Sequence, residues 1–445
     1  MPGDDRRSGE LSKLPDTRQG RNGYLHFMNE VDVLVIGAGP AGMAAATSAQ
    51  ESGARVAMVD DNWSAGGQIW RGIHDSCTRI PAGVRTLWGT QVVARGTSEH
   101  TLLLEDSKQA VEVAFDKLIL ATGARELYLP FPGWTLPGVM GAGGLQALVK
   151  SGLGIHGKSV VIAGSGPLLL AVAAYLRKAG ARIKLIAEQA TTKAVSSFAF
   201  HMVRYPQKMR QAAALKLSLH GVPYLRSCWV EATEGEGRLR SVRLRQGRKS
   251  WTEDCDYAGI GYGLYPNSEL ACLLGCRLRA NAIEVNEWQR TSVDGVFAAG
   301  ECTGIGGVDL SLLEGAIAGY AACGDTGRAS RLFGKRSHAK RFAGALGRAF
   351  RLREELRTLP RPETIICRCE DVLYEKLQQM SSFRAAKLHT RCGMGPCQAR
   401  ICGVATAFLF GWRTDSVRPP ILPARAASLA IRKEFQREAD LKVLP

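Results

Sequence analysis

The chain has 445 residues, more than one hydrophobic core ordinarily supports, so two or three domains are expected. Hydrophobic residues make up 45% of a globular composition, and many of the 50 glycines lie in turn-rich α/β motifs. The net charge of +17 is concentrated in residues 191–250 and 331–361. No aromatic-rich basic module accompanies these segments, so solvated faces or subunit contacts are expected there, and no nucleic-acid binding.

Neither end of the sequence nor its apolar runs predict a membrane-spanning segment. Residues 1–28 are polar and carry mixed charges, which indicates a disordered tail, and Met28 is a candidate for the true start. The longest uncharged run, Ser159–Leu176, contains GSGP in its middle, so it is expected to form strand, turn and helix. Without a signal-peptide core, a cytoplasmic location is expected, with peripheral association at the inner membrane as an option. In a reducing cytosol, cysteines favour metal or cluster binding over disulfides.

Residues 31–60 predict a dinucleotide-binding βαβ unit. An apolar strand meets a glycine turn, a small-residue helix follows from about residue 40 to 52, and a second strand ends on Asp60. The glycines serve the tight turn, the approach of backbone to a pyrophosphate and close helix packing, and the helix N-terminus favours phosphate. Asp60 can take the ribose hydroxyls. The candidate binding residues are Gly37, Gly39, Pro40, Ala41, Gly42 and Asp60.

Two further loops are candidates for contact with the same cofactor. In the segment GGQIWRG, Gly67 gives flexibility and Gln68 can hydrogen-bond an isoalloxazine or ribityl group, with a plain surface loop as the alternative. Residues 111–123 are expected to form a strand that ends in a turn at Thr122 and Gly123. A proline-rich segment follows, which suits a crossing into a second domain.

Residues 158–188 repeat the opening pattern, with a strand over 160–163, a turn at Gly164 and Gly166, a helix over 167–178 and a second strand ending on Glu188. Leu169 replaces the third glycine, which separates helix and strand slightly. The repeat predicts a second nucleotide fold and leaves its occupancy open between NAD(P)H, an adenine nucleotide and an empty structural domain. No arginine cluster follows Glu188, so a 2′-phosphate is not supported.

Residues 291–320 predict a strand over 296–299, then Gly300 and Glu301, then a helix of small residues. This pattern is typical of a second flavin motif in which an acid contacts the ribityl chain. The usual acid is Asp, and Glu301 is longer. The first domain is therefore expected to be split in sequence, with the second inserted into it.

Five of the twelve cysteines fall within residues 367–402. Cys367 and Cys369 can point at one centre from an extended turn, and either neighbouring pair of Cys392, Cys397 and Cys402 could complete a four-thiolate shell. Four thiolates suit a [2Fe–2S] cluster or zinc. An iron–sulfur cluster can carry electrons to or from a flavin, and a zinc ion cannot. The cluster is therefore favoured over a zinc site and over five unrelated buried cysteines.

Six motifs occur in this order: GAGPAG, GGQIWRG, ATGARE, GSGPLLLAVAA, VFAAGE and CRCE…CGMGPCQARICG. In this ordered set the chain resembles the A (alpha) subunits of opine (octopine and nopaline) oxidases. It is also similar to the B subunit of hydrogen cyanide synthase and to the alpha subunit of D-hydroxyproline dehydrogenases. The resemblance covers about residues 29–430. It implies FAD or another adenine nucleotide, FMN at a subunit interface as a further option, and a bacterioferritin-associated-ferredoxin-like [2Fe–2S] domain bound through Cys367, Cys369, Cys397 and Cys402, with Cys392 as an alternative ligand.

The fold class expected is α/β, a Rossmann-like flavoprotein of the pyridine nucleotide-disulfide oxidoreductase type with two dinucleotide-binding domains. The predicted organisation is a tail 1–28, an FAD domain 29–145 plus 285–328, an inserted NAD-like domain 146–284, a basic linker 329–361, and the cluster domain with a C-terminal tail 362–445.

The resemblance implies that a partner flavoprotein subunit oxidises an amino-acid-derived substrate, while this chain passes electrons onward. A small ferredoxin-like subunit and a membrane-associated acceptor are further expected partners. No catalytic residue is identified, because no histidine or carboxylate constellation accompanies the flavin motifs. Three hypotheses remain: a subunit that cleaves an opine oxidatively, with the sibling amino-acid dehydrogenases as variants, a stand-alone NAD(P)H-dependent flavin reductase, and a redox-sensing scaffold.

Overall fold

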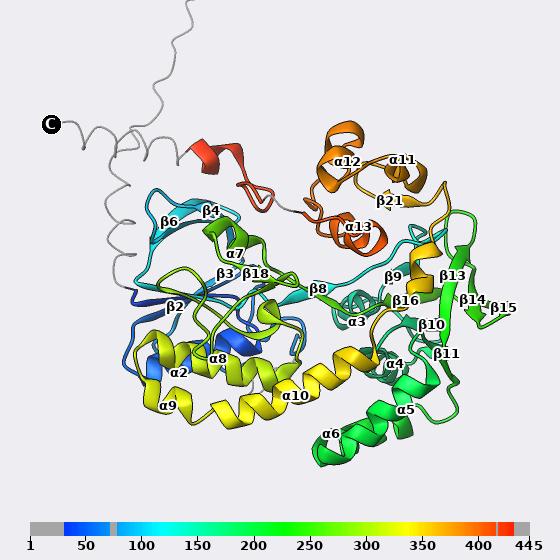
Figure 1. Cartoon of the computed structure of the whole chain (residues 1–445), viewed down its shortest axis with the longest axis horizontal. Helices are drawn as coiled ribbons and strands as arrows, with labels where there is room; N and C mark the ends of the chain where they lie inside the picture. Colours follow the sequence, from blue (N-terminus) through cyan, green and yellow to red (C-terminus); the bar gives the residue numbers. More distant parts are fainter. Residues whose placement is uncertain (1–30, 72–77, 415–416, 431–445) are drawn as a thin grey trace, which may run out of the picture.

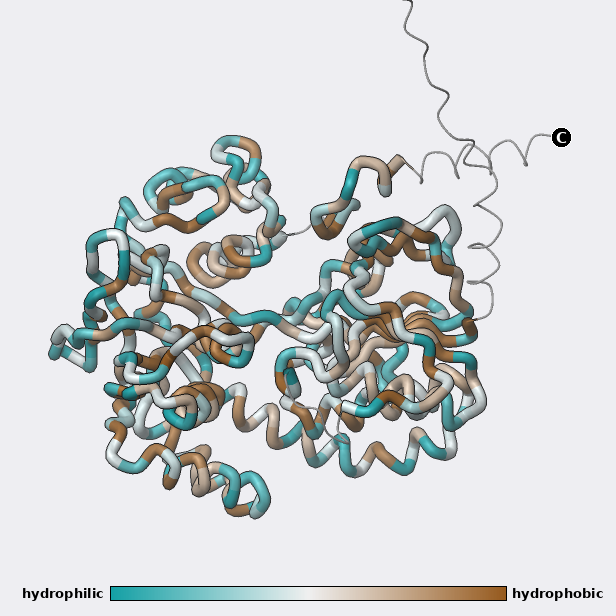
Figure 2. Tube along the Cα trace, turned by 180° about the vertical axis from the view of Figure 1, so that it is seen from behind, coloured by the Kyte–Doolittle hydropathy of each residue, from teal (hydrophilic) through white to brown (hydrophobic). Residues whose placement is uncertain are grey.

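The computed structural model describes residues 31–71, 78–414 and 417–430. Two parallel five-stranded sheets form separate lobes joined by a pair of extended strands (Figure 1). Hydrophobic residues gather along the strands inside each lobe (Figure 2). None of the helices in the described ranges is long and apolar enough to cross a membrane. The predicted tail 1–28 and Met28 lie outside the described residues.

The first sheet has the strand order β20-β7-β1-β2-β3, with every neighbouring pair parallel. Its strands are β1 Val33–Ile36, β2 Val56–Asp60, β3 Arg85–Trp88, β7 Lys117–Leu120 and β20 Val296–Ala298. Helices α2 (Pro40–Glu51) and α8 (Val308–Ala322) pack against one another. A Cβ at Gly315 would lie 2.1 Å from the Ala41 carbonyl oxygen, so only glycine permits this approach. The predicted βαβ unit and the later strand are confirmed.

A small antiparallel sheet covers the first lobe and corrects one expectation. It consists of β4 Gln91–Arg95, β5 Thr101–Glu105 and β6 Ala110–Ala114. The single strand expected over 111–123 was wrong, because the chain leaves β6 at Phe115 and enters β7 at Lys117. The Phe115 N–H bonds to the His100 carbonyl, whereas the Lys117 N–H bonds to the Asp32 carbonyl beside β1. One apolar run therefore serves two different sheets.

The second sheet has the order β12-β11-β10-β16-β9, also parallel throughout. Its strands are β9 Val139–Gly141, β10 Ser159–Gly164, β11 Arg182–Glu188, β12 Tyr224–Arg226 and β16 Tyr257–Gly261. The antiparallel strands of this lobe are β13 Cys228–Glu234, β14 Ser241–Gln246 and β15 Lys249–Asp254. The helices are α3 Ala142–Lys150, α4 Leu168–Lys178, α5 Thr192–His201, η2 Met202–Arg204 and α6 Pro206–Ser218. The second βαβ unit lies within one residue of its predicted bounds.

The chain crosses between the lobes on β8 (Ala124–Glu126) and β17 (Leu264–Pro266), which pair antiparallel. Strand β9 already belongs to the second sheet. The returning elements pack on the first core, and they are α7 Glu269–Leu274, β18 Leu278–Arg279, β19 Ala282–Ile283 and η3 Gly300–Thr303. Both crossings thus lie earlier in the chain than the expected boundaries at residues 145 and 285, because the sheet edges rather than the proline-rich segment set them.

After α8 the chain forms α9 (Thr326–Ser330), the long helix α10 (Phe333–Ala349) and η4 (Glu354–Thr358). The segment expected as a basic linker is therefore mostly helix, and α10 runs along both lobes (Figure 1). A small domain with its own core follows, built from β21 Ile365–Cys367, β22 Val372–Leu373, α11 Tyr374–Gln378, α12 Phe383–Thr390 and α13 Cys402–Phe410. Beyond it, residues 417–430 return to the first lobe, where the Ile421 N–H bonds to the Val93 carbonyl.

Candidate functional site

The first glycine turn is held by contacts that exclude any side chain. Gly37 has φ +105°, and a Cβ there would lie 2.3 Å from the Ala121 carbonyl oxygen. A Cβ at Gly42 would lie 1.8 Å from the Gly37 carbonyl oxygen. Gly39 differs, because a Cβ would meet nothing within 4 Å. Helix α2 begins at Pro40 and Ala41, and no side chain caps its N-terminus. Unpaired backbone N–H groups therefore lie next to the open space at Gly39, which is the arrangement that binds a phosphate.

Asp60 is 8% exposed and is fixed at the end of β2 by the glycine turn. Its Oδ2 accepts a hydrogen bond from the Ala38 N–H at 2.5 Å, and its Oδ1 accepts from the Asn62 N–H at 2.8 Å. The acid predicted for the ribose hydroxyls therefore also supports the turn.

The other loops expected at the first cofactor converge on the same edge of the sheet. The Gly66 N–H bonds to the Ala38 carbonyl, and a Cβ at Gly67 would lie 3.0 Å from Gly39 Cα, so this loop packs on the glycine turn. Gln68 is exposed. Thr122 and Gly123 begin the crossing, where Thr122 Oγ1 donates to the Asn267 carbonyl at 2.7 Å.

Gly300 and Glu301 lie where β20 meets η3. Gly300 has φ +80°, and a Cβ there would lie 2.6 Å from Ala41 Cβ, so this turn also approaches α2 closely. Glu301 Oε1 accepts from the Gly307 N–H at 3.1 Å, at the start of α8. Burial raises the pKa of Glu301, while hydrogen bonds from the Gly307 and Gly306 N–H groups act in the opposite direction. The carboxylate thus binds the N-terminus of α8, on the same side as the first turn.

The turn of the second βαβ unit has the same backbone design. Gly164 has φ +141°, and a Cβ there would lie 1.8 Å from the Gly261 carbonyl oxygen. The Gly166 N–H donates to Glu188 Oε2 at 2.7 Å. Glu188 is fully buried, and burial raises its pKa to about 7. Like Asp60 at the first turn, Glu188 is therefore buried and hydrogen-bonded to its own glycine turn.

The connector between α10 and η4 covers this second turn. Ser165 Oγ donates to the Phe350 carbonyl at 3.0 Å, and Gln189 Nε2 donates to the Arg351 carbonyl at 3.2 Å. Gln189 Oε1 in turn accepts from the Arg353 N–H at 3.2 Å. A Cβ on Gly166 would meet the ring of Phe350 at 3.9 Å. Backbone of the connector therefore lies against the second glycine turn.

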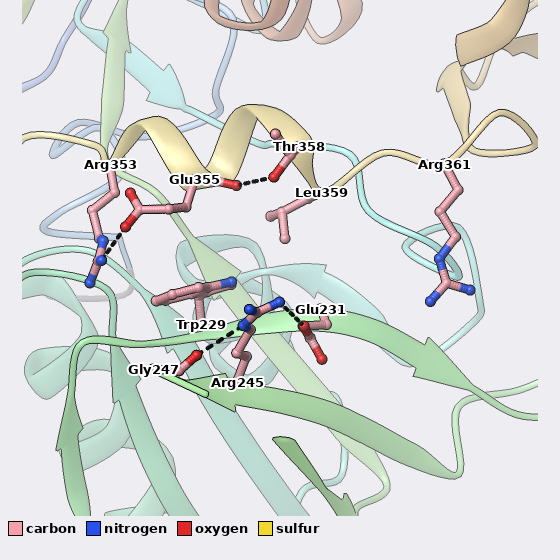
Figure 3. Close-up of a pocket in the computed structure, with 9 residues that line it drawn as sticks. All are labelled: Trp229, Glu231, Arg245, Gly247, Arg353, Glu355, Thr358, Leu359 and Arg361. Atoms are coloured by element: carbon pink, nitrogen blue, oxygen red, sulfur yellow. Dashed lines mark hydrogen bonds and ion pairs between the residues drawn. The ribbon is translucent and has the colours of Figure 1, made fainter. Parts of the chain in front are cut away.

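The cavity next to the connector has a volume of ≈ 390 Å³ and contains none of the predicted site residues (Figure 3). The Arg353 guanidinium stacks 4.8 Å above Trp229 and pairs with Glu355, and Arg245 pairs with Glu231 at 3.1 Å. Each ion pair lies within one wall of the cavity, and the stacking of Arg353 on Trp229 joins the two walls, so we interpret the cavity as the joint between the connector and the second lobe.

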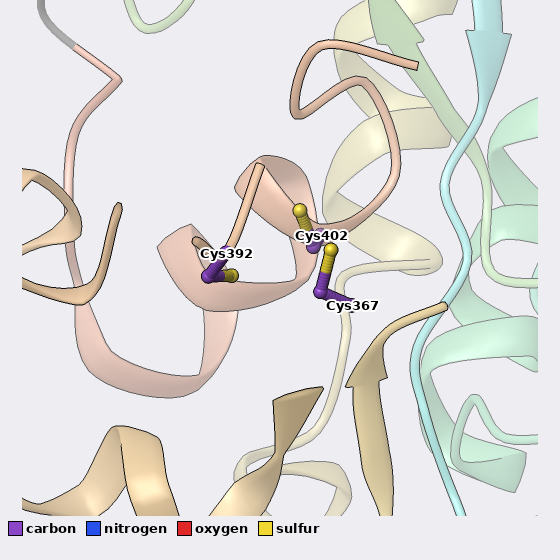
Figure 4. A group of neighbouring side chains, drawn as sticks. All are labelled: Cys367, Cys392 and Cys402. Atoms are coloured by element: carbon purple, nitrogen blue, oxygen red, sulfur yellow. The ribbon is translucent and has the colours of Figure 1, made fainter. Parts of the chain in front are cut away.

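Three cysteines of the small domain form a buried triad. The Sγ atoms of Cys367, Cys392 and Cys402 all lie within 4.8 Å of one another, and each residue is at most 1% exposed (Figure 4). They come from the end of β21, the loop after α12 and the start of α13. The Gly393 N–H donates to Cys367 Sγ at 3.5 Å. Hydrogen bonds from the Cys392 and Cys402 thiols lower the pKa of Cys367.

The remaining two cysteines form a pair next to the triad. Cys369 Sγ accepts a hydrogen bond from the Cys397 N–H, and a second hydrogen bond joins the two free thiols. A Cβ at Gly395 would lie 2.3 Å from Cys369 Cβ, so the 393–397 loop lies directly on the pair. The structure thus brings all five sequence-predicted cysteines together, as a pair and a triad. Soft thiolates in a compact group fit an iron–sulfur cluster.

Arg125, which the sequence motifs did not single out, joins the crossing strands to the cysteine loop. Its guanidinium donates to Asn267 Oδ1 at 2.7 Å and to the Arg400 carbonyl at 3.0 Å, and it pairs with Glu269 at 2.8 Å. The Arg400 side chain donates back to the Cys397 carbonyl at 3.3 Å. Because Asn267 also bonds Thr122, a continuous polar network runs from the first cofactor's turn to the cysteine loop.

Two further carboxylates were also missed, the half-buried Glu126 and the buried Glu314. Glu126 accepts from the Gly143 N–H at 2.6 Å and the Gly144 N–H at 2.9 Å, at the start of α3. Glu314, which belongs to α8, accepts a hydrogen bond from the Gly300 N–H at 3.1 Å. The position of Arg125 and Glu126 directly after the ATG turn was the available signal, whereas no local pattern marks Glu314.

A model of the pyridine nucleotide-disulphide oxidoreductase family matches residues 31–322. The HcnB subunit of hydrogen cyanide synthase from Pseudomonas protegens is 30% identical over 83% of this chain and 89% of its own length. The A subunit of opine oxidase from Agrobacterium tumefaciens is 32% identical over 90% of this chain and 91% of its own length. The resemblance read from the motifs is therefore confirmed.

Among solved structures, the crystal structure of L-proline dehydrogenase from P. horikoshii matches with a TM-score of 0.64. It is 18% identical in sequence, and the match covers 90% of this chain and 79% of that one. At this identity the match concerns the fold alone. The expected α/β fold with two Rossmann-like lobes is confirmed.

The Arg125 network generates a stability prediction. Replacing Arg125, which is 17% exposed, with Ala leaves Glu269 and the Arg400 carbonyl without their donor, and is expected to cost about 2 kcal/mol of unfolding free energy. Amides of residues 391–402 should then exchange faster with deuterium. As a matched control, Arg277→Ala removes a guanidinium that is 76% exposed, with an expected cost below about 0.5 kcal/mol. Equal costs and unchanged exchange would contradict a clamping role.

Proposed function

The chain belongs to the pyridine nucleotide-disulphide oxidoreductase family, and we propose that it is the electron-transfer subunit of a multisubunit dehydrogenase that cleaves an opine. As a member of this family it is an FAD-dependent oxidoreductase. The observation that carries the proposal is the polar network from Thr122 through Asn267 and Arg125 to Arg400. It supports the proposal because it connects the loop that carries Cys397 to the turn proposed to contact the first cofactor.

The residues around the first turn suit a dinucleotide. The space at Gly39, the uncapped N-terminus of α2 and Asp60 would hold pyrophosphate and ribose, and Glu301 would lie near the ribityl chain. Bound FAD accepts two electrons together and can release them one at a time. The task of this chain is then to hold the cofactor and to keep the cysteine loop fixed against it.

The proposed cluster ligands are Cys367, Cys369, Cys397 and Cys402. The pair Cys369 and Cys397, together with Cys367 and Cys402 of the triad, would supply four thiolates to a cluster that carries electrons. Cys392, the third member of the triad, is the alternative ligand. Gly393, whose N–H points at Cys367 Sγ, would stabilise charge on that sulfur.

Substrate oxidation is assigned to a partner flavoprotein subunit. An opine loses a hydride from the carbon next to nitrogen and a proton from the nitrogen, giving an imine. Water adds to the imine, and cleavage of the carbon–nitrogen bond releases an amino acid and a 2-keto acid. The relatives named as subunits support a heteromer, and octopine or nopaline is proposed from the opine oxidase relatives. The hydrogen cyanide synthase relatives make a related amino-acid dehydrogenase the alternative.

The connector argues against a stand-alone NAD(P)H-dependent reductase. Its bonds to Ser165 and Gln189 cover the only other glycine turn of dinucleotide type in the described part of the chain. A purely redox-sensing scaffold would not need a network that reaches the first cofactor's turn. The experiments below distinguish the stand-alone reductase and the redox-sensing scaffold from the electron-transfer subunit.

The substrate proposal is tested with the complex purified through this chain together with its partner subunits. Octopine or nopaline, supplied with an artificial electron acceptor, is expected to yield arginine and a 2-keto acid in equal amounts. Omitting each opine in turn is the control. Activity on D-hydroxyproline or glycine alone would overturn the opine assignment while leaving the electron-transfer role in place.

The proposed ligand set predicts which of five Cys→Ser variants lose the cluster and which one keeps it. Cys367→Ser, Cys369→Ser, Cys397→Ser and Cys402→Ser should each lose the visible absorbance and iron of the cluster, because serine oxygen is a poor ligand for iron–sulfur centres. Cys392→Ser should keep both and serves as the matched buried control. Iron analysis and electron paramagnetic resonance of the dithionite-reduced chain provide the readouts. Loss at Cys392 with retention at Cys402, or zinc in place of iron, would contradict the assignment.

A further inference from the structure

The two basic segments of the sequence come together on one side of the molecule. Helix α5 packs against α10, with the rings of Phe198 and Phe342 5.8 Å apart and those of Tyr205 and His338 4.6 Å apart. Helices α10, α5 and α6 lie along one edge of the molecule, and α6 projects from it (Figure 1). We call the exposed residues of α5, η2, α6 and α10 the basic face.

The charge of the basic face is unbalanced. Residues 192–218 contain five Lys or Arg and no Asp or Glu. Nearby acids are already used, since Asp309 pairs with Lys208 at 2.8 Å and Glu314 pairs with Lys340 at 3.2 Å. Within the described ranges, seven exposed cations of this face form no ion pair, and they are Lys193, Arg204, Arg210, Lys216, Lys335, Arg341 and Arg348.

Large apolar side chains lie exposed among these cations. Phe200 is 80% exposed, Val203 61% and Leu217 77%. Helix α6 has no buried residue, and Met209 and Leu217 are eight residues apart, so they lie on the same side of it. Exposed Phe, Val, Met and Leu side chains on neighbouring elements, set among unpaired cations, are the combination that a lipid headgroup layer and its acyl boundary accept.

We propose that the basic face docks this chain on an anionic phospholipid bilayer. Seven unpaired cations match a negatively charged headgroup layer, and the side chains of Phe200, Val203 and Leu217 would enter the boundary with the acyl chains. A nucleic acid has the matching charge, but it offers little to exposed aliphatic side chains. Docking needs no membrane-spanning helix and no bound cofactor, so it stands or falls separately from the proposed redox function.

The test uses the purified full chain and two vesicle preparations, one of phosphatidylcholine alone and one of equal parts phosphatidylcholine and phosphatidylglycerol. The chain is expected to sediment with the anionic vesicles and to stay in the supernatant with the neutral ones. Added salt should weaken the binding, because it screens the charges. A chain that stays in the supernatant with both preparations would overturn the proposal.

Variants locate the contact. Phe200→Ser combined with Leu217→Ser, and Arg204→Glu combined with Arg210→Glu, are each expected to weaken binding at least about tenfold. Leu388→Ser and Arg248→Glu change equally exposed residues elsewhere and should bind like the original chain. Circular dichroism verifies the fold of every variant. Unchanged binding in both double variants, or loss in the controls as well, would refute this face as the docking surface, and so would binding that proves to be to a protein partner only.

Discussion

The guanidinium of Arg125 is the interaction on which the arrangement of the redox sites depends. It lies on a crossing strand, stacks 5.1 Å above the Tyr265 ring of the other crossing strand, and reaches the loop that carries Cys397. A planar group with five donors in a fixed fork can satisfy an amide, a carboxylate and a carbonyl at separate positions, whereas the three donors of a lysine radiate from a single nitrogen. The small cysteine domain has its own core, so without such a clamp its distance from the first lobe would vary. A fixed distance is what electron transfer between two centres needs.

The two βαβ units share one backbone design and differ in what covers them. At the first, Gly39 faces open space and the helix N-terminus is uncapped. At the second, Ser165 and Gln189 hold the connector backbone, and Glu188 is buried against its own turn. The connector is also the path by which the chain reaches the cysteine domain. One segment thus lies against the second glycine turn and leads to the cysteine domain, which supports the proposal that this fold uses a single nucleotide.

What the sequence could predict is local. The glycine turns at Gly37 and Gly164 and their flanking strands follow from apolar runs and from close backbone contacts that only glycine permits, and the structure has them within a residue or two. The break at Phe115 was missed because one apolar run feeds two sheets. The closure by Phe350 and the role of Arg125 could not be read from the chain, since both join residues far apart in sequence. The cysteine spacing predicted that the five thiols lie together, whereas their division into a pair and a triad could be seen only in the structure.

The measurement that tests the central claim most directly is an anaerobic absorbance titration of the purified chain, carrying its FAD, with NADH and then with NADPH. If the chain only passes on electrons from a partner protein, the flavin band stays oxidised with both nucleotides, and it bleaches when that partner and an opine are added. Bleaching of the flavin by either nucleotide in the isolated chain would contradict the account, because the connector would then not close the second nucleotide edge.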